Sequence, residues 1–351
     1  MVRKNTKILF AAQDPGGFNA LLPVFLEFKK RGVNCLMILA GQSRLLAKRQ
    51  RIKFKDGSLL TAKKIASYLK DEDVDCVVVG TSDGLSLDKR VTSWAKSQGL
   101  PSLAIIDFWS VDHRERFSSP QVLDHRYEPD VICVIDELMK RRLISEGFRP
   151  RKIKITGNPF FSIFKQPLPS GGRYLLFICQ PFSEIYSKLD KLTGQPDFNE
   201  VQILADYLKL FRLLKIRQPI KIALHPRTIK KNKFDHLKVD SLGQLEIVQT
   251  DTYKLIPGAF LIFGINSVIL FQAALQGKKV VSYQPGITKQ QDILMSNRLG
   301  LSYSAYNLQQ LKIILGRCFS RKLKNPEIIR RRYVSDQPKL KILRVIEQLV
   351  N

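Results

Sequence analysis

The stretch Ile220-Lys-Ile-Ala-Leu-His225-Pro226-Arg227 indicates which class of fold the chain adopts. Its apolar start, bounded by Pro219, predicts a short buried strand of a parallel sheet. The strand must end by Pro226, because proline has no N–H to donate within a central strand. In an open α/β sheet, ligands bind in the crevice beyond the carboxyl ends of the strands. A His and an Arg placed there suit a phosphate group, although a solvated loop with an incidental His is the alternative.

Two other predicted strands end in polar residues of the same kind. Residues 173–179 are apolar and are followed by Gln180-Pro181, and residues 260–263 lead into Gly264-Ile-Asn266-Ser267 and then a helical pattern. The backbone N–H groups at such a helix N-terminus, together with the Ser267 hydroxyl, form an anion site. Strand ends that supply Gln, His-Arg and Asn-Ser therefore predict a nucleotide site in one crevice.

The composition is that of an ordinary globular protein, with 44% hydrophobic and 25% charged residues. At 351 residues the chain is long enough for two domains. The sequence shows no apolar run that would span a bilayer and no secretory signal, and its five scattered cysteines lack metal-ligand spacing. We therefore expect a cytoplasmic protein with reduced thiols and no metal site.

The charge is unusual, because 58 Lys and Arg residues outnumber 31 acids and give a formal net charge of +27. Such a field attracts nucleic acid, anionic lipid head groups or acidic glycans, although a solvated basic surface is the commonest explanation. The basic residues concentrate in residues 44–55 and 312–344, and neither block matches a nucleic-acid-binding module. We expect no specific nucleic acid partner, and we expect the block 44–55 to contact an anionic membrane surface.

The N-terminal half alternates predicted strands and helices. Strands at 7–12 and 34–40 flank an amphipathic helix at 18–31, which defines a right-handed βαβ unit. The segment after the first strand supplies a candidate acceptor loop with paired glycines that permit close backbone approach; its residues are Asp14, Gly16, Gly17 and Asn19. The loop is not G-x-G-x-x-G, so no dinucleotide site is predicted.

Four more strands, at 75–79, 102–106, 129–135 and 152–156, complete this half. The first of them ends in Gly80-Thr-Ser-Asp83-Gly84 and the second ends on Asp107. Residues 161–172, with two prolines and a glycine pair, form the predicted linker. The predicted organisation is an N-terminal Rossmann-like domain at 1–160, this linker, a second Rossmann-like domain at 173–335, and a C-terminal amphipathic helix at 336–351.

Two such halves facing a cleft resemble the GT-B architecture of nucleotide-sugar glycosyltransferases. The segments Leu176-Phe-Ile-Cys-Gln180-Pro181-x-x-Glu184 and 222–227 resemble the Q-P and H-P motifs of bacterial CMP-sugar transferases of the sialyl and Kdo types. The H-P segment also resembles CDP-glycerol transferases. Residues 155–159 resemble a hinge-side motif of UDP-GlcNAc 2-epimerase-like and lipid A disaccharide synthase-like proteins. The resemblance implies an α/β chain with two doubly wound Rossmann-like domains.

The resemblance also implies that the C-terminal domain binds the donor, because in that group the His and a Ser-rich turn contact the donor phosphate. Gln272 stands nearest the position where many UDP-sugar members place a ribose-binding Glu. The sequence therefore does not decide whether the donor nucleotide is CMP or UDP. The predicted donor-site residues are Gln180, Glu184, His225, Pro226, Arg227, Gly264, Asn266, Ser267 and Gln272.

The predicted function is a metal-independent transfer of a sugar from a nucleotide donor to a cell-envelope saccharide or a lipid-linked acceptor. His225, Arg227 and Ser267 would stabilise the leaving phosphate, so no cofactor is expected. The acceptor hydroxyl needs a base in the N-terminal domain. Asp83 is the first candidate, although sialyltransferases carry two acids before the glycine here; Asp107 is second and Asp14 third. Each of them could instead cap the adjacent helix or turn.

Three alternatives remain. A UDP-GlcNAc 2-epimerase-like isomerase would share the fold and the nucleotide pocket, but its set of several acids and a His is not found in the expected contexts. A CDP-glycerol-type glycerophosphotransferase would share the H-P motif. A polyanion-binding protein without enzymatic activity would follow from the net charge alone.

Overall fold

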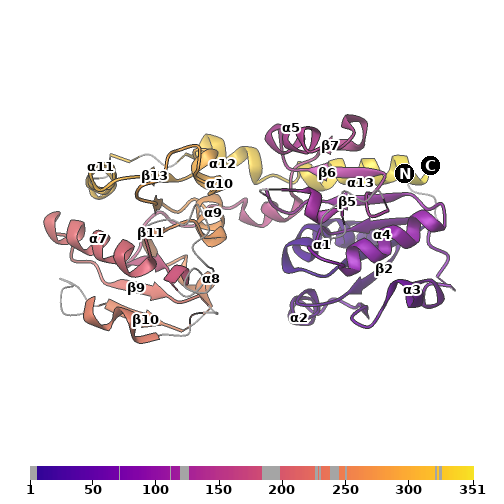
Figure 1. Ribbon diagram of the computed structural model, residues 1–351, viewed down its shortest axis with the longest axis horizontal. Coiled ribbons are helices and arrows are strands. Elements are labelled where there is room, and N and C mark those ends of the chain that lie inside the picture. The colour runs from indigo at the N-terminus through magenta and orange to yellow at the C-terminus, as the bar shows by residue number, and fades with distance from the viewer. Residues whose placement is uncertain are drawn as a thin grey trace. The chain divides into compact units, whose positions relative to one another are not determined.

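The computed structural model (Figure 1) describes residues 6–351 except 71, 111, 119–125, 184–197, 226–227, 229–230, 238–244, 250, 321 and 324–325. The chain forms two compact units. Unit 1 comprises Met1–Ile163 and Ser335–Asn351, and unit 2 comprises Phe164–Val334. The predicted linker at 161–172 is thus divided between the units, and the C-terminal helix, predicted as a separate element, belongs to unit 1.

Unit 1 is built on a seven-stranded parallel sheet in the order β3-β2-β1-β4-β5-β6-β7. The chain passes from β1 to one edge and then returns to β4 on the other side, so the topological switch point lies between β1 and β4. The strands are β1 (Lys7–Ala12), β2 (Asn34–Leu39), β3 (Lys55–Asp56), β4 (Cys76–Val79), β5 (Ser102–Ile105), β6 (Val131–Val134) and β7 (Ile153–Ile155). The helices are α1 (Pro15–Lys30), α2 (Ser43–Arg49), α3 (Ala62–Tyr68), α4 (Leu87–Ser97), α5 (Glu137–Ser145) and α13 (Gln337–Val350).

Unit 2 repeats this plan with six parallel strands in the order β10-β9-β8-β11-β12-β13, and its switch point lies between β8 and β11. The strands are β8 (Tyr174–Ile178), β9 (Ile220–Ala223), β10 (Leu245–Val248), β11 (Ala259–Gly264), β12 (Val280–Tyr283) and β13 (Tyr303–Ala305). The helices are α7 (Glu200–Leu213), α8 (Thr252–Leu255), α9 (Val268–Leu275), α10 (Met295–Arg298), α11 (Leu308–Phe319) and α12 (Glu327–Tyr333). The predicted α/β class with two doubly wound, Rossmann-like units is confirmed.

The C-terminal helix α13 completes the core of unit 1. Its side chains Ile342, Leu343 and Ile346 are buried in the same apolar cluster as residues of β1 and α1. Ion pairs flank this packing, since Lys339 contacts Glu27 at 3.0 Å and Arg31 contacts Glu347 at 3.4 Å. Burial of three large aliphatic side chains is worth roughly 1.5–3 kcal/mol each, so the helix is an integral part of unit 1.

The basic block predicted at 312–344 does not form one surface. Arg330 on α12 is buried, and its guanidinium donates to the carbonyls of Phe164 at 2.7 Å and Leu275 at 3.0 Å while pairing with Glu327. It therefore anchors the segment that enters unit 2 to the end of α9.

Within the described residues, no helix has the length and apolar character needed to cross a membrane.

Candidate functional site

The register of the sheet in unit 2 places three predicted strand ends side by side. Ile178 at the end of β8 is paired with Gly264 of β11 on one side and with Ala223 of β9 on the other. Gln180, His225 and Asn266 each follow one of these paired residues by two positions. All three therefore reach the same edge of the sheet, at its switch point, where ligands of doubly wound folds bind.

Gln180 and Asn266 hold each other in a reciprocal pair of hydrogen bonds. The Gln180 amide donates to Asn266 Oδ1 at 2.9 Å, and the Asn266 backbone N–H donates to Gln180 Oε1 at 3.0 Å. Gly264, two residues earlier, allows this close approach, because a Cβ there would lie 2.8 Å from the Ile178 carbonyl oxygen. Gln180 therefore positions the turn before α9.

Ser267 is the N-cap of α9, and its hydroxyl oxygen accepts a hydrogen bond from the Ile269 N–H at 3.2 Å. The start of α9 thus points at the same edge as Gln180 and His225. A helix N-terminus with a serine hydroxyl can donate several hydrogen bonds to a phosphate. The phosphate site predicted from the sequence would lie at this helix start.

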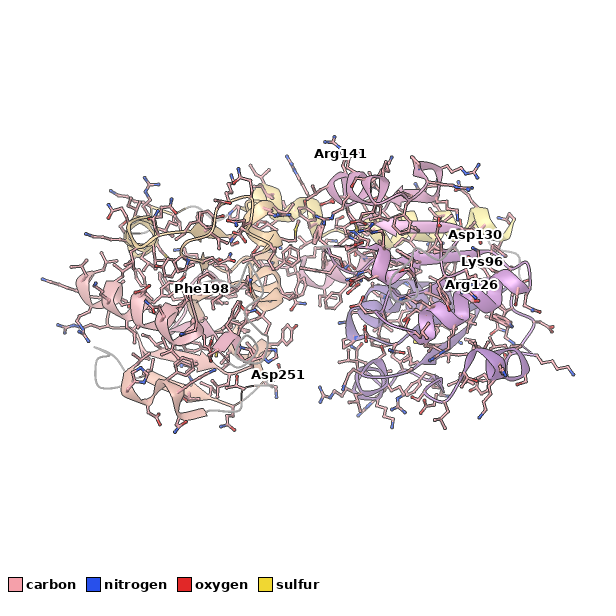
Figure 2. All side chains as sticks on the ribbon, viewed as in Figure 1. Lys96, Arg126, Asp130, Arg141, Phe198 and Asp251 are labelled. Atoms are coloured by element: carbon pink, nitrogen blue, oxygen red, sulfur yellow. The ribbon has the colours of Figure 1, made fainter. Side chains whose placement is uncertain are left out.

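Tyr253 is a residue of this region that the sequence analysis missed. It lies on the short helix α8, which Asp251 caps (labelled in Figure 2), and its hydroxyl donates to Oε1 of Gln272 on α9. Tyr253 is 49% exposed. An exposed aromatic ring beside the predicted ribose-binding residue offers a stacking surface for a nucleobase.

Three predicted donor-site residues, Glu184, Pro226 and Arg227, lie outside the described residues. His225 is half-buried, and its carbonyl accepts a hydrogen bond from the Thr228 N–H at 2.9 Å. Among the residues that the structure describes, no group of three or more His, Cys, Asp or Glu side chains could hold a metal ion.

The switch point of unit 1 brings the candidate acceptor loop against the end of β4. The Asp14 N–H donates to Ser82 Oγ at 3.1 Å, and a Cβ on Gly17 would lie 3.2 Å from the Gly80 Cα. The glycine at position 17 thus permits the close backbone approach. Asn19 lies partly buried in the second turn of α1.

Asp107, after β5, is held by neighbours on two sides. Its carboxylate lies so close to Gly16 that a Cβ there would be 1.8 Å from Asp107 Oδ2. Arg116 donates to Asp107 Oδ1 at 2.8 Å and also to both oxygens of Thr81. Arg116 and the start of α1 thus hold the Asp107 carboxylate in place, so the geometry favours a positioning role for Asp107.

Asp14 and Asp83 remain as exposed carboxylates of this crevice. Partial desolvation raises the pKa of Asp14, and the nearby carboxylates of Asp83 and Asp107 raise it further, while Ser82 and Arg116 act in the opposite direction. A carboxylate with a raised pKa at the mouth of a crevice suits general-base chemistry better than a paired one. Asp83, predicted first, and Asp14, predicted third, are therefore both exposed candidates for the base.

Asp88 is a second residue that the sequence analysis missed. It comes two residues after Ser86, where an acidic residue is common in the first turn of a helix. Its side chain is only 2% exposed, beneath Gly80, and neither carboxylate oxygen has a hydrogen-bond partner among the described residues. Burial raises the pKa of Asp88 to about 6, and Ser82 and Ser86 lower it only in part.

We predict that Asp88→Asn stabilises the protein at neutral and alkaline pH. A carboxyl whose pKa is raised by folding is most favourable below its unfolded pKa of about 3.9, and its contribution is lost as the pH rises through about 6. The uncharged Asn should therefore gain up to about 3 kcal/mol at about pH 8 and nothing at about pH 4. Urea unfolding at both pH values measures this, with the exposed Asp83→Asn as the control. Equal destabilisation of Asp88→Asn at both values would refute it.

The comparisons with known proteins concern the fold. No protein-family model and no curated protein sequence matches the chain. Among solved structures, the UDP-GlcNAc 2-epimerase from Methanocaldococcus jannaschii aligns at a TM-score of 0.71 and 17% identity, covering 98% of this chain and 100% of that one. The UDP-GlcNAc 2-epimerase from Neisseria meningitidis bound to UDP-GlcNAc aligns at 0.65 and 15%, covering 99% and 100%. The glycotransferase of kitacinnamycin aligns at 0.58 and 11%, covering 99% and 100%.

These likenesses cover almost the whole chain and establish its fold. The protein has the GT-B fold, with two Rossmann-like units. At identities this low, the likeness carries the architecture but not the reaction.

Proposed function

We propose that the protein is a glycosyltransferase that takes a sugar from a nucleotide donor, CMP- or UDP-linked, and transfers it to a saccharide or lipid-linked acceptor of the cell envelope. The observation that carries this proposal is the convergence of Gln180, His225 and Asn266-Ser267 at the switch point of unit 2. These residues offer hydrogen-bond donors where a nucleotide phosphate would lie.

In the proposed mechanism, unit 2 stabilises the charge that develops on the leaving phosphate. The His225 side chain, the Ser267 hydroxyl and the N-terminus of α9 donate to it, which is the role that a metal plays in other transferases. Arg227 would add a positive charge beside His225. The reaction is therefore proposed to need no metal, and activity should persist in excess chelator.

Unit 1 is proposed to supply the base that takes the proton of the acceptor hydroxyl. Asp14 is the favoured base because of its exposure and its raised pKa, and Asp83 is the second candidate. Asp107, with its Arg116 partner, would hold the start of α1 in place and so position Asp14.

A sugar-nucleotide 2-epimerase is the second candidate function, because UDP-GlcNAc 2-epimerases are among the solved structures that share this fold. Incubation with UDP-GlcNAc in the absence of any acceptor separates the two candidates. An epimerase would form the mannosamine product, whereas a transferase would leave the sugar configuration unchanged. Calorimetry with CMP, CDP, UDP and GDP then identifies the donor base, and binding of none of them would overturn both functions.

A further inference from the structure

Unit 1 carries a groove that shares no residue with the crevice described above. It has a volume of about 560 Å³ and lies between α5, the edge strand β7 and the C-terminal helix α13. Five basic side chains line it, and the described lining residues include no Asp or Glu. These five side chains, which we call the groove cations, are Lys140, Arg151, Lys154, Lys341 and Arg344.

The groove cations differ from the basic residues around them in having no counter-ion. Within the described part of the chain, none of the five makes an ion pair or a side-chain hydrogen bond. Neighbours on the same elements are paired: Lys152 contacts Glu128 at 3.0 Å, and Lys339 contacts Glu27 at 3.0 Å. Arg141 of α5 points away from the body of the unit (Figure 2) and pairs with Glu137. Like charges gathered without acids favour an anionic ligand.

Apolar side chains lie among these charges. Ile155 on β7 lines the groove and is 37% exposed, and Val345 of α13 lines it as well. Ile144, one helical turn after Lys140 on α5, adds a further exposed aliphatic side chain. A surface that mixes Lys and Arg with exposed aliphatic groups matches the boundary between phospholipid head groups and acyl chains. The described lining residues include no aromatic ring on which a nucleobase could stack, which argues against single-stranded nucleic acid.

The block predicted from the sequence to contact a membrane is less suitable. Arg44 pairs with Asp56 and Lys55 pairs with Glu72. Lys48, Arg49, Arg51 and Lys53 are exposed and make no ion pair with any residue that the structure describes. This block follows β2 and ends on β3, at the edge of the sheet opposite β7. In Figure 1, α2 and β7 lie at opposite ends of unit 1, so each surface can be altered without touching the other.

We propose that the groove between α5, β7 and α13 binds the phosphate-bearing head groups of anionic phospholipids and thereby holds unit 1 on a membrane surface. The inference stands apart from the proposed transfer reaction, because it rests on residues that take no part in that reaction. Binding should depend on salt, since exposed charges are screened over about 8 Å at physiological ionic strength.

The test is co-sedimentation of the full-length protein with vesicles of phosphatidylcholine, with or without phosphatidylglycerol. The groove variant combines Arg151→Gln, Lys154→Gln, Lys341→Gln and Arg344→Gln, all at exposed positions. The matched control combines Lys48→Gln, Arg49→Gln, Arg51→Gln and Lys53→Gln, which removes the same charge from the opposite edge. We expect the groove variant to bind mixed vesicles about 100-fold or more weakly, and the control to bind within about threefold of the native protein.

The proposal is overturned by equal loss or no loss in both variants, by loss only in the control, or by equal binding of the native protein to neutral vesicles. Tight binding of single-stranded DNA at physiological salt that only the groove variant loses would overturn it in favour of nucleic acid. The double variant Lys341→Gln/Arg344→Gln should show an intermediate loss of vesicle binding. Its thermal melt should match that of the native protein, which separates lost binding from a folding defect. Calorimetry with nucleotides should give the same affinity in every variant. A negative result for lipid binding is therefore separate from a negative result for the proposed reaction.

Discussion

Replacing Asp14 by Asn is expected to lower the turnover of the proposed transfer by about 100-fold to 10,000-fold, the usual contribution of a general base. Asp14 is exposed at the start of α1, and desolvation together with Asp83 and Asp107 raises its pKa. A raised pKa means that the carboxylate takes up its proton at a higher pH than an ordinary aspartate. The rate should therefore fall on acidification with a midpoint above about 3.9, and this limb of the pH profile should vanish in Asp14→Asn.

Two companion variants decide between the acids of this crevice. Asp83→Asn, the change that the sequence alone favoured, should reduce turnover less than Asp14→Asn. Asp107→Asn should lower stability as well as turnover, because it weakens the ion pair with Arg116. Nucleotide affinity, measured by calorimetry, should barely change in all three, since the proposed nucleotide site is in unit 2. Full activity in Asp14→Asn with loss in Asp83→Asn would return the role of base to Asp83.

The strands that the sequence predicts are mostly the buried ones. Apolar runs such as residues 75–79 and 173–179 mark strands that are covered on both faces, and the structure has β4 and β8 there. The unpredicted strands, β3, β10 and β13, all lie at sheet edges. Edge strands are short and half-solvated, so their residues need not form an apolar run, and β10 has no fully buried residue. Local pattern therefore reaches the centre of each sheet and, of the four edge strands, only β7, which the sequence predicts at 152–156.

The candidate site in unit 2 could be predicted because it follows from strand ends alone. Once β8, β9 and β11 are parallel neighbours, the residues two positions beyond each end share one edge, whatever the details of packing. Tyr253, Asp88 and the groove cations could not be predicted in this way. Tyr253 and the groove cations depend on contacts between different elements, such as Tyr253 with Gln272 or α13 with β7, and Asp88 depends on its burial beneath Gly80. Sequence periodicity gives no information on such contacts.

Replacing His225 by Ala is expected to reduce turnover by about 100-fold to 1,000-fold, which is the typical cost of removing one donor to a developing negative charge. His225 follows the end of β9, next to the end of β8, and it is only half-buried. Its loss should leave the thermal midpoint of unfolding nearly unchanged, because the apolar core of unit 2 does not include it.

The matched control is His236→Ala, an exposed histidine of the 3₁₀ segment Lys231–Leu237 in the same unit. It should keep native turnover and native nucleotide affinity. Steady-state kinetics then separate two roles for His225. A fall in turnover with little change in nucleotide affinity indicates that His225 acts on the transition state, whereas weaker affinity with unchanged turnover indicates binding of the ground state alone. Native values for both quantities would make His225 an incidental residue after the end of β9, and the phosphate would then have to be held by Asn266, Ser267 and the start of α9.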